Sequence, residues 1–359
     1  MKAAIKSEAT EKGTVEPQGP LPETDNHEET RRIPMTKKKL IIAAGVVVLA
    51  LTLLLVIGAN LLVSAALVPS FMRRLEAFQT ITEDSVAALV HTDDITANQQ
   101  EAYSETEQWL ETADASRLTA ETEDGYRLVA EEFHPRQESS RWVLLLHGYT
   151  GWKEAMYPIA MEYVQRGFHA LVPDMRCQGE SEGDFIGMGW TDRLDNRIWI
   201  SHILEENPDA EIVIQGQSMG AACALLMTGE ELPDNVKAVV SDCAYTDAYE
   251  MFKKQMGEWF HLPSFPLLPV ANLMLQLRGG YDLKNAAPIR AVTHSRIPTL
   301  FIHGLKDQMI DPQMTRDLYA AASCPKQLLL VEGAGHAQSQ DKDPELYYGT
   351  IFDLLAQYL

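Results

Sequence analysis

The sequence predicts an α/β domain with a mainly parallel central sheet, preceded by one membrane-spanning helix. Three observations predict this fold. An uncharged apolar stretch runs from Leu40 to Val68. After residue 116, short apolar runs that end in Gly or Asp alternate with helical stretches, as is typical of strands buried on both faces of a sheet. One of these runs leads into a serine between two glycines, in "IVIQGQSMGAACALL".

The composition limits the classes of protein to consider. The chain has 359 residues of which 46% are apolar, which is enough for a sizeable packed core. The net charge of −21 argues against a nucleic-acid partner, because phosphate binding depends on an excess of Lys and Arg. The four cysteines are widely spaced and form no C-x-x-C pair, so we expect free or buried thiols rather than a metal site or a disulfide framework. They are Cys177, Cys223, Cys243 and Cys324.

The N-terminal part of the chain divides at residue 40. Residues 1–39 are polar, rich in Pro and Gly and without an apolar period, which predicts a disordered tail. The 29 residues from Leu40 to Val68 would form a helix about 43 Å long, against about 30 Å for a hydrocarbon core, so they predict a transmembrane helix. The alternative is a signal peptide cleaved near Ala65, but its apolar core would be only roughly 7–15 residues long.

Basic residues are distributed unevenly about this helix. Because positive charge stays on the cytoplasmic side, the bias predicts a single-pass cell-membrane protein with a cytoplasmic N-terminus and an extracytoplasmic domain. Five basic residues lie within the 15 residues before the helix and two within the 20 residues after it: Arg31, Arg32, Lys37, Lys38 and Lys39 against Arg73 and Arg74.

Residues 69–116 form an acidic segment between the membrane and the domain. From Leu75 to Ser116 the segment contains no Lys or Arg, and its apolar residues recur at loosely helical spacing. This pattern predicts a stalk of two modest helices. A surface that recruits a partner is the alternative.

Residues 117–359 form the predicted α/β domain. A hairpin around Asp124-Gly125 opens it. An apolar insertion at about 249–292 is interrupted by Pro263, Pro266 and Pro269, and it is either a lid with an acyl pocket or a buried crossover helix. Six further runs are predicted strands: "WVLLLHG", "HALVPD", "EIVIQG", "VKAVVSD", "PTLFIHG" and "QLLLVEG".

Ser218 is the candidate nucleophile. It follows the run "EIVIQ" and precedes a helical pattern. A sharp strand-to-helix turn needs small residues two positions away on each side, and Gly216 and Gly220 occupy these positions. Such a turn also places the Met219 N–H at a helix N-terminus, where it can stabilise an oxyanion. The alternative is a serine in an ordinary tight turn.

A serine hydroxyl needs a general base and an orienting carboxylate to act as a nucleophile. His336 lies in a glycine-rich loop after the last predicted strand, and Asp307 follows the strand before it. Functional groups of parallel sheets collect at the carboxyl ends of strands, so we expect these side chains to meet Ser218. Asp311 and Asp242 remain alternatives for the carboxylate.

The loop after the first central strand, "HGYTGWKEA", is the candidate for the second oxyanion donor. Its Tyr149 backbone N–H would face the Met219 N–H. His147 and Gly148 would also form a strand-end turn without any catalytic role. Trp190, in "SEGDFIGMGW", either lines the pocket or belongs to a packed loop.

These motifs carry a family resemblance. "HGYTG", "PDMRCQGESEGDFIGMGWTDRLD", "GQSMG", "HGLKDQMIDP" and "GAGH" resemble the α/β-hydrolases, in particular membrane-anchored bacterial hydrolases of the BEM46-like and serine-aminopeptidase-like groups. The resemblance covers about residues 101–359. It implies an α/β-hydrolase fold, a triad of Ser218, Asp307 and His336, and an oxyanion hole of Tyr149 and Met219. Cys177 departs from the pattern, since relatives often carry Gly or another small or polar residue there.

The expected function is that of a membrane-anchored serine hydrolase, of carboxylesterase or lipase type, that cleaves an ester, thioester or small amide. No metal or organic cofactor is required for this chemistry. The expected partners are a small-molecule or lipid-like acyl substrate and the membrane. Two alternatives stay open: a serine aminopeptidase, and a binding protein that keeps the scaffold without catalysis.

Overall fold

The computed structural model describes residues 36–76 and 93–359. The chain divides into two units, Met1–Ala50 and Leu51–Leu359. The tail that we predict to be disordered, residues 1–39, lies almost entirely outside the described residues.

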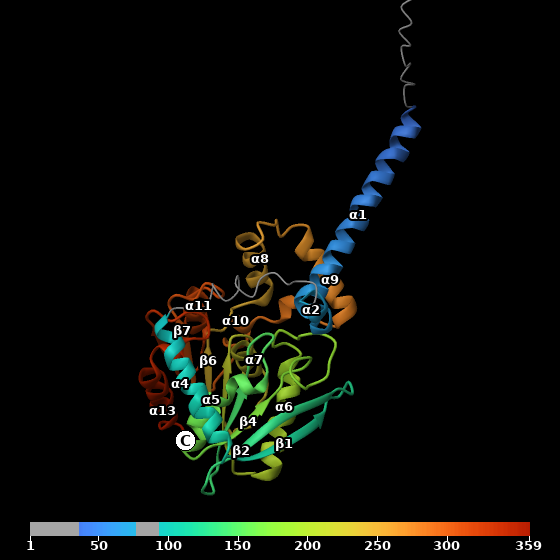
Figure 1. The fold of residues 1–359 in the computed structure, drawn as a ribbon. Helices are drawn as coiled ribbons and strands as arrows, with labels where there is room; N and C mark the ends of the chain where they lie inside the picture. The colour runs from blue at the N-terminus through green and yellow to red at the C-terminus, as the bar shows by residue number, and fades with distance from the viewer. Residues whose placement is uncertain (1–35, 77–92) are drawn as a thin grey trace, which may run out of the picture. The chain divides into compact units, whose positions relative to one another are not determined.

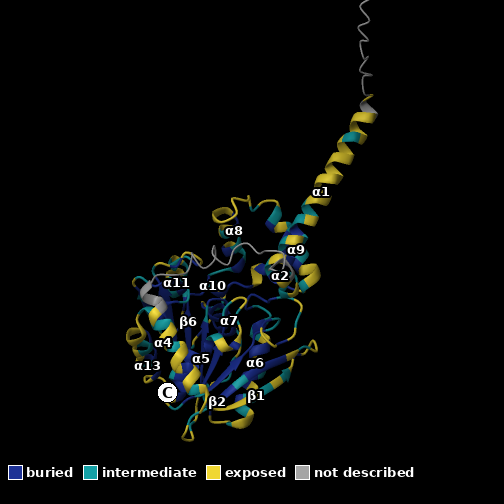
Figure 2. Ribbon diagram, in the orientation of Figure 1, coloured by how far each residue is buried: buried dark blue, intermediate teal, exposed yellow. Residues whose placement is uncertain are grey.

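Helix α1 runs from Lys37 to Leu67. Within the described residues it is the one helix long and apolar enough to cross a membrane. Its bounds agree with the predicted span from Leu40 to Val68, and most of its side chains as far as Leu54 are exposed (Figure 2). A break at Val68 separates it from the short helix α2, Pro69–Glu76.

The domain is built on an eight-stranded sheet in the order β1-β2-β4-β3-β5-β6-β7-β8 (Figure 1). From β4 to β8 along this order the neighbouring strands are parallel, which confirms the mainly parallel sheet. The strands are β1 Asp114–Glu121, β2 Arg127–His134, β3 Arg141–Leu146, β4 His169–Pro173, β5 Glu211–Gln217, β6 Val236–Asp242, β7 Thr299–Gly304 and β8 Lys326–Val331.

The predicted hairpin is present as β1 and β2. The two strands pair antiparallel with Asp114 opposite His134, and β2 also pairs antiparallel with β4. The first strand therefore begins at Asp114, three residues before the predicted start of the domain. The hairpin turn contains Gly125 at φ 86°, a conformation that glycine adopts without strain.

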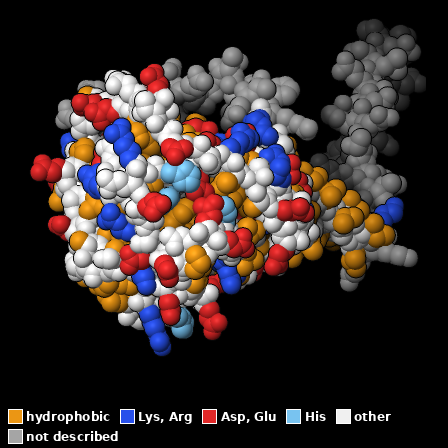
Figure 3. All heavy atoms as spheres, turned by 90° about the horizontal axis from the view of Figure 1, so that it is seen from below, with side chains coloured by type: hydrophobic (Ala, Val, Ile, Leu, Met, Phe, Trp, Pro, Cys, Tyr) orange, Lys and Arg blue, Asp and Glu red, His pale blue; other side chains and the backbone are white. Residues whose placement is uncertain are grey.

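Helices cover both faces of the sheet because alternate residues of the central strands point to opposite sides. Val143 and Leu145 belong to the buried cluster that includes residues of α5 and α13. Trp142 and Leu144 belong to the cluster on the other face, which includes residues of α6, α7 and α11. Seen from the side below, acidic and basic side chains are interspersed over the surface (Figure 3). The covering helices are α5 Tyr157–Gln165, α6 Asp192–Glu206, α7 Met219–Met227, α11 Pro312–Ala321 and α13 Pro344–Leu355, with the short α12 Ser339–Lys342 and the 3-10 helix η1 Lys153–Met156 between them.

An insertion between β6 and β7 corresponds to the predicted lid at about 249–292. Its two longer helices lie beyond the carboxyl ends of the strands (Figure 1). Pro263 and Pro266 lie in the segment between these helices, as expected for residues that interrupt a helix. The insertion contains α8 Ala248–Glu258, α9 Leu267–Gly279, the 3-10 helix η2 Leu283–Asn285 and α10 Pro288–Ala291.

Helix α4, Asp93–Leu110, lies in the segment 69–116 for which we predict a helical stalk, and residues 77–92 of that segment lie outside the described residues. The helix packs against α5 and α12 instead of standing apart from the domain. The Trp109 ring lies 4.8 Å from that of Phe133, and the Asn98 amide donates to the backbone oxygen of Asp341 at 2.7 Å. The acidic composition masked this packing because α4 uses few apolar residues to make it.

Candidate active site

Ser218 lies at the tip of a strained turn between β5 and α7. Its backbone adopts φ 56° and ψ −116°, a conformation that non-glycine residues rarely adopt. A Cβ on Gly216 would lie 2.2 Å from the carbonyl carbon of Gly220, and a Cβ on Gly220 would lie 2.0 Å from the Leu146 oxygen. Both glycines are therefore required sterically, as the sequence predicted.

The structure brings Ser218, His336 and Asp307 together in one hydrogen-bonded series. The Ser218 hydroxyl donates to His336 Nε2 at 2.9 Å, and His336 Nδ1 donates to Asp307 Oδ2 at 2.7 Å. Ser218 is 9% exposed, and the Asp307 side chain is fully buried. This arrangement can transfer a proton from the hydroxyl to the imidazole while the carboxylate stabilises the resulting positive charge.

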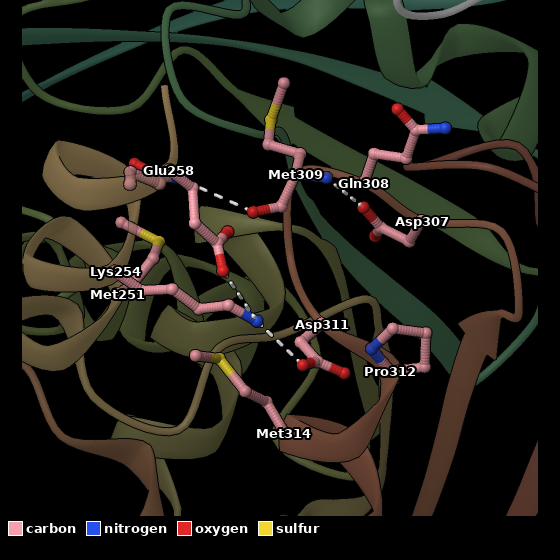
Figure 4. A pocket seen from close by; sticks show the side chains of 10 residues that line it. Met251, Lys254, Glu258, Asp307, Gln308, Met309, Asp311, Pro312 and Met314 are labelled. Atoms are coloured by element: carbon pink, nitrogen blue, oxygen red, sulfur yellow. Dashed lines mark hydrogen bonds and ion pairs between the residues drawn. The ribbon is translucent and has the colours of Figure 1, made fainter. Parts of the chain in front are cut away.

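The two alternative carboxylates do not reach His336 by any hydrogen bond in the described structure. Asp311 caps the N-terminus of α11, accepting from the Gln313 N–H at 2.9 Å, and it pairs with Lys254 at 2.7 Å. Figure 4 shows this pair together with Asp307 around a cavity of about 360 Å³ between α8 and the start of α11. Asp242 is buried behind the site and accepts from the Tyr347 hydroxyl at 3.2 Å.

His303 is a site residue that the sequence analysis missed. Its Nε2 donates to Asp307 Oδ2 at 3.0 Å, and its Nδ1 lies 2.6 Å from the Thr315 hydroxyl. Asp307 Oδ1 also accepts from the backbone N–H groups of Met309 and Ile310, each at 2.8 Å. Burial alone would raise the Asp307 pKa, but the hydrogen bonds from His303 and His336 hold it well below its usual range. The carboxylate therefore stays ionised and fixed.

The candidate oxyanion donors lie at the start of α7 and in the loop after β3. Met219 is the first residue of α7, so its N–H has no partner within that helix. A Cβ on Gly148 would lie 3.4 Å from the Ser218 Cβ, so the loop that carries Tyr149 passes directly beside the nucleophile. Among the described residues, the Tyr149 N–H donates no backbone hydrogen bond. Within residues 36–76 and 93–359 neither N–H donates a backbone hydrogen bond, so both are available to an oxyanion.

His147 has a structural role in this loop beyond closing the strand. Its Nδ1 donates to the Gly148 oxygen at 2.8 Å, and its Nε2 accepts from the Met175 N–H at 2.9 Å. Burial lowers the His147 pKa, which is consistent with a neutral ring that donates from one nitrogen and accepts at the other. The His147 ring therefore connects the loop after β3 with the loop after β4 at the carboxyl edge of the sheet.

Cys177 and Trp190, which the sequence analysis singled out, both lie in the segment between β4 and α6. The guanidinium of Arg193 lies 3.5 Å from the centre of the Trp190 ring, and the ring packs on the core, so Trp190 belongs to a packed loop. Cys177 has φ 67°, in the left-handed region that favours glycine. All four cysteines are free, as expected.

Several described side chains have the spacing of metal ligands. Cys243 lies beside Asp307 and His336, with the three candidate ligand atoms within 4.8 Å of one another. At the opposite end of the sheet, Glu132 is grouped with His134 and His169, whose Nδ1 atoms are 3.1 Å apart. Within each group two members are in direct contact: His336 with Asp307 at 2.7 Å, and His134 with His169. That the chemistry needs no metal stays a prediction.

A buried carboxylate behind the site leads to a prediction about stability. Asp341 lies on α12, 4% exposed, and its Oδ2 has no hydrogen-bond partner among the described residues. Burial, and then the charge of Asp242, raise the Asp341 pKa to about 7. Since Asp341 in the unfolded chain ionises near pH 4, the stability that its neutral form contributes is complete below that pH and is lost as the pH rises to about 7.

Replacing Asp341 with asparagine is therefore expected to stabilise the protein at pH 8 and to change its stability little at pH 4. The expected gain is on the order of 2–4 kcal/mol in the free energy of unfolding. Thermal unfolding of both proteins across this pH range measures it. Asp209→Asn, at an exposed position, is the control. Equal effects of Asp341→Asn at both pH values would contradict the assignment.

Comparison with known proteins identifies the fold. The family model of the alpha/beta hydrolase fold matches residues 141–275. YqkD of Bacillus subtilis (strain 168), an uncharacterised protein, is 32% identical over 54% of this chain and 64% of its own, just under two thirds of its length. A thermostable monoacylglycerol lipase of Bacillus sp. (strain H-257) is 21% identical over 60% of this chain and 90% of its own.

A solved structure agrees with this match. The esterase Pf2001 of Pyrococcus furiosus superposes with a TM-score of 0.57 at 20% identity, covering 69% of this chain and 93% of the esterase. At this identity the likeness concerns the fold alone. The matched segment includes β3, β5 and the turn at Ser218. The chain therefore has the α/β-hydrolase fold.

Proposed function

We propose that the protein is a serine hydrolase that cleaves a carboxylic ester, a thioester or a small amide through an acyl-enzyme intermediate. The observation that carries this proposal is the series from Ser218 through His336 to Asp307, with contacts of 2.9 and 2.7 Å. The three side chains come from distant parts of the chain. A binding role would require none of them to align in this order.

The geometry supports the following reaction. Ser218 Oγ attacks the carbonyl carbon of the substrate while its proton passes to His336 Nε2. Asp307 stabilises the imidazolium, and the N–H groups of Met219 and Tyr149 stabilise the oxyanion. His336 then gives the proton to the leaving group, and the acyl group stays on Ser218. In the second half, His336 removes a proton from water, which attacks the acyl-enzyme and releases the acid.

An ester is the favoured substrate because the space beside Tyr149 is apolar. A cavity of about 380 Å³ that includes the Tyr149 side chain is lined mostly by aliphatic and aromatic residues. Such a lining suits an acyl chain better than the charged terminus of a peptide. The similar Bacillus protein is named a monoacylglycerol lipase and the Pyrococcus protein an esterase, which also supports ester hydrolysis. The aminopeptidase remains the alternative.

A substrate panel tests this proposal. We expect the full-length protein in detergent to hydrolyse p-nitrophenyl esters of acids from acetate to dodecanoate. We expect it to hydrolyse aminoacyl-arylamides at least about a hundredfold more slowly in kcat/KM, because the described lining of the cavity beside Tyr149 includes no charged side chain to bind a free amine. Preference for the arylamides would favour the peptidase. No turnover of either class would favour a non-catalytic binding protein.

We also propose that α1 anchors the enzyme in the cell membrane, with the N-terminus in the cytoplasm and the domain outside. The length and apolarity of α1 support the anchor, and the excess of basic residues before it supports the orientation. In spheroplasts of a bacterial expression host, added protease is expected to digest the domain and to spare residues 1–39. Protection of the domain would reverse the proposed orientation.

A further inference from the structure

The apolar cavity beside Tyr149 is built partly from the last two turns of α1. Helix α1 contributes Leu62, Val63, Ala65, Ala66 and Leu67 to its lining. The other walls come from the insertion: α8 and the segment after it, and α9. All of these residues belong to the unit Leu51–Leu359.

The end of α1 is a fixed part of this unit. Ala59, Val63 and Leu67 are at most 4% exposed and belong to the core cluster that includes α7 and β5. The Leu67 oxygen accepts from the Ile186 N–H at 2.9 Å, and the Arg278 guanidinium of α9 donates to Asn60 Oδ1 at 2.9 Å. A helix that only tethered the domain would not bury these residues in its core.

Tyr149 connects this wall with the reacting atoms. Its backbone N–H is the proposed oxyanion donor, its side chain lines the cavity, and its hydroxyl donates to the Ala66 oxygen at the end of α1. The oxyanion donor and the cavity wall therefore belong to the same residue. A substrate whose carbonyl group binds the Tyr149 N–H can extend its acyl chain into the cavity between α1 and the insertion.

The cavity has almost no free polar group for a polar ligand. Two of its lining residues carry side-chain amides. The Asn272 amide donates to Asp282 at 2.9 Å while its oxygen accepts from the Leu283 N–H at 2.9 Å. The Gln255 amide donates to the Met309 oxygen at 3.3 Å. An apolar chain satisfies this lining, and a sugar or charged group would lose its hydrogen bonds with water.

The insertion also exposes large apolar side chains, of which Phe260 lines the cavity. Phe260 is 65% exposed, Phe265 is 77% exposed and Leu277 is 72% exposed. Soluble proteins seldom expose such residues together, and helices with exposed aromatic and aliphatic residues commonly lie at lipid surfaces. These residues favour a lipid of the surrounding membrane over a water-soluble ester as the source of the chain.

We propose that the C-terminal turns of the membrane helix α1 form one wall of the acyl-binding site, and that the substrate is a membrane lipid ester whose acyl chain lies between α1 and the insertion. This inference rests on the proposed hydrolase function. The anchor is then part of the substrate site as well as the attachment to the membrane.

Filling the cavity from the α1 side tests the inference. Leu62→Trp in the full-length protein, assayed in lipid nanodiscs, is expected to lower the ratio of kcat/KM for p-nitrophenyl dodecanoate to that for the acetate by about tenfold or more. That is the loss expected when roughly two methylene groups of the chain are no longer buried. Ala65→Phe, at an exposed position on the same wall, is the milder second variant.

The control is Leu61→Trp on the same helix. Leu61 is 50% exposed and does not line the cavity, so this variant is expected to keep the wild-type ratio. An unchanged ratio in both cavity variants, or an equal change in Leu61→Trp, would overturn the acyl site while leaving Ser218-dependent hydrolysis of acetate intact. Absence of acetate hydrolysis in the wild type would instead remove the proposed function.

A second measurement does not depend on catalysis and also separates membrane lipid from soluble ester. In Ser218→Ala nanodiscs, a phospholipid with a photoreactive diazirine on its acyl chain is expected to crosslink to peptides of α8 and α9 as well as α1, and Leu62→Trp is expected to reduce the α8 and α9 crosslinks severalfold. Crosslinks confined to α1 would show only contact with surrounding lipid and would overturn the inference.

Discussion

Replacement of Ser218 with alanine is expected to lower kcat toward p-nitrophenyl acetate by about a millionfold, because the alanine side chain has no oxygen to form the acyl-enzyme. The residual rate would come from the oxyanion donors Met219 and Tyr149 and from substrate binding. Steady-state kinetics of the full-length protein in detergent measures the loss, and circular dichroism checks that the variant is folded. His336→Ala is expected to cause a loss of similar size, since the three groups act as one unit.

Ser201→Ala is the matched control. Ser201 is an exposed serine on α6 whose hydroxyl donates to the Arg197 oxygen at 3.0 Å. This variant is expected to keep wild-type kinetics. If Ser218→Ala retained most of the activity, another nucleophile would be responsible and the assignment of the site would be wrong.

Asp307→Asn is expected to lower kcat by about 10⁴-fold with little change in fold, a loss of the size that this substitution causes in serine proteases. The Asn side chain can occupy the same space, but it loses the charge that stabilises the His336 imidazolium. Its amide group can also turn an N–H toward His336 Nδ1 and so favour the wrong tautomer. The same assay as for Ser218 measures the change.

Asp311→Asn provides a comparison within the same loop. Asparagine caps a helix as well as aspartate does, so the start of α11 should remain intact, and the lost pair with Lys254 is exposed and contributes little. We expect kcat within about twofold of wild type, because Asp311 makes no contact with His336 in the described structure. A larger loss in Asp311→Asn than in Asp307→Asn would reverse the assignment of the carboxylate.

Much of the fold was predictable because it follows from local patterns. The uncharged run predicted α1 within three residues at its start, and buried strands produce continuous apolar runs that are visible in the sequence. The position of β4 between β2 and β3 was not predictable, because strand pairing depends on contacts between residues distant in the chain. The packing of α4 on the domain was not predictable for the same reason. It depends on contacts between residues distant in the chain, such as that of Trp109 with Phe133.

The candidate site, too, was predictable only where the signal is local. The turn at the nucleophile could be predicted from a local motif, Gly216, Ser218 and Gly220, because the close approach of backbone segments excludes larger residues at the two glycines. The choice of Asp307 over Asp311 and Asp242 needed coordinates, since all three follow or end buried strands. His303 could have been noticed four residues before Asp307 at the end of a strand. The wall that α1 contributes to the cavity has no signal in the sequence.

Labelling with a fluorophosphonate probe tests the central claim most directly, because the probe reacts with a serine only when a base activates it. We predict one adduct per chain, located by mass spectrometry on the peptide that contains Ser218, and loss of that adduct in a folded His336→Ala variant. Absence of labelling in the folded wild-type protein, or labelling of Ser218 that persists in His336→Ala, would contradict the claim.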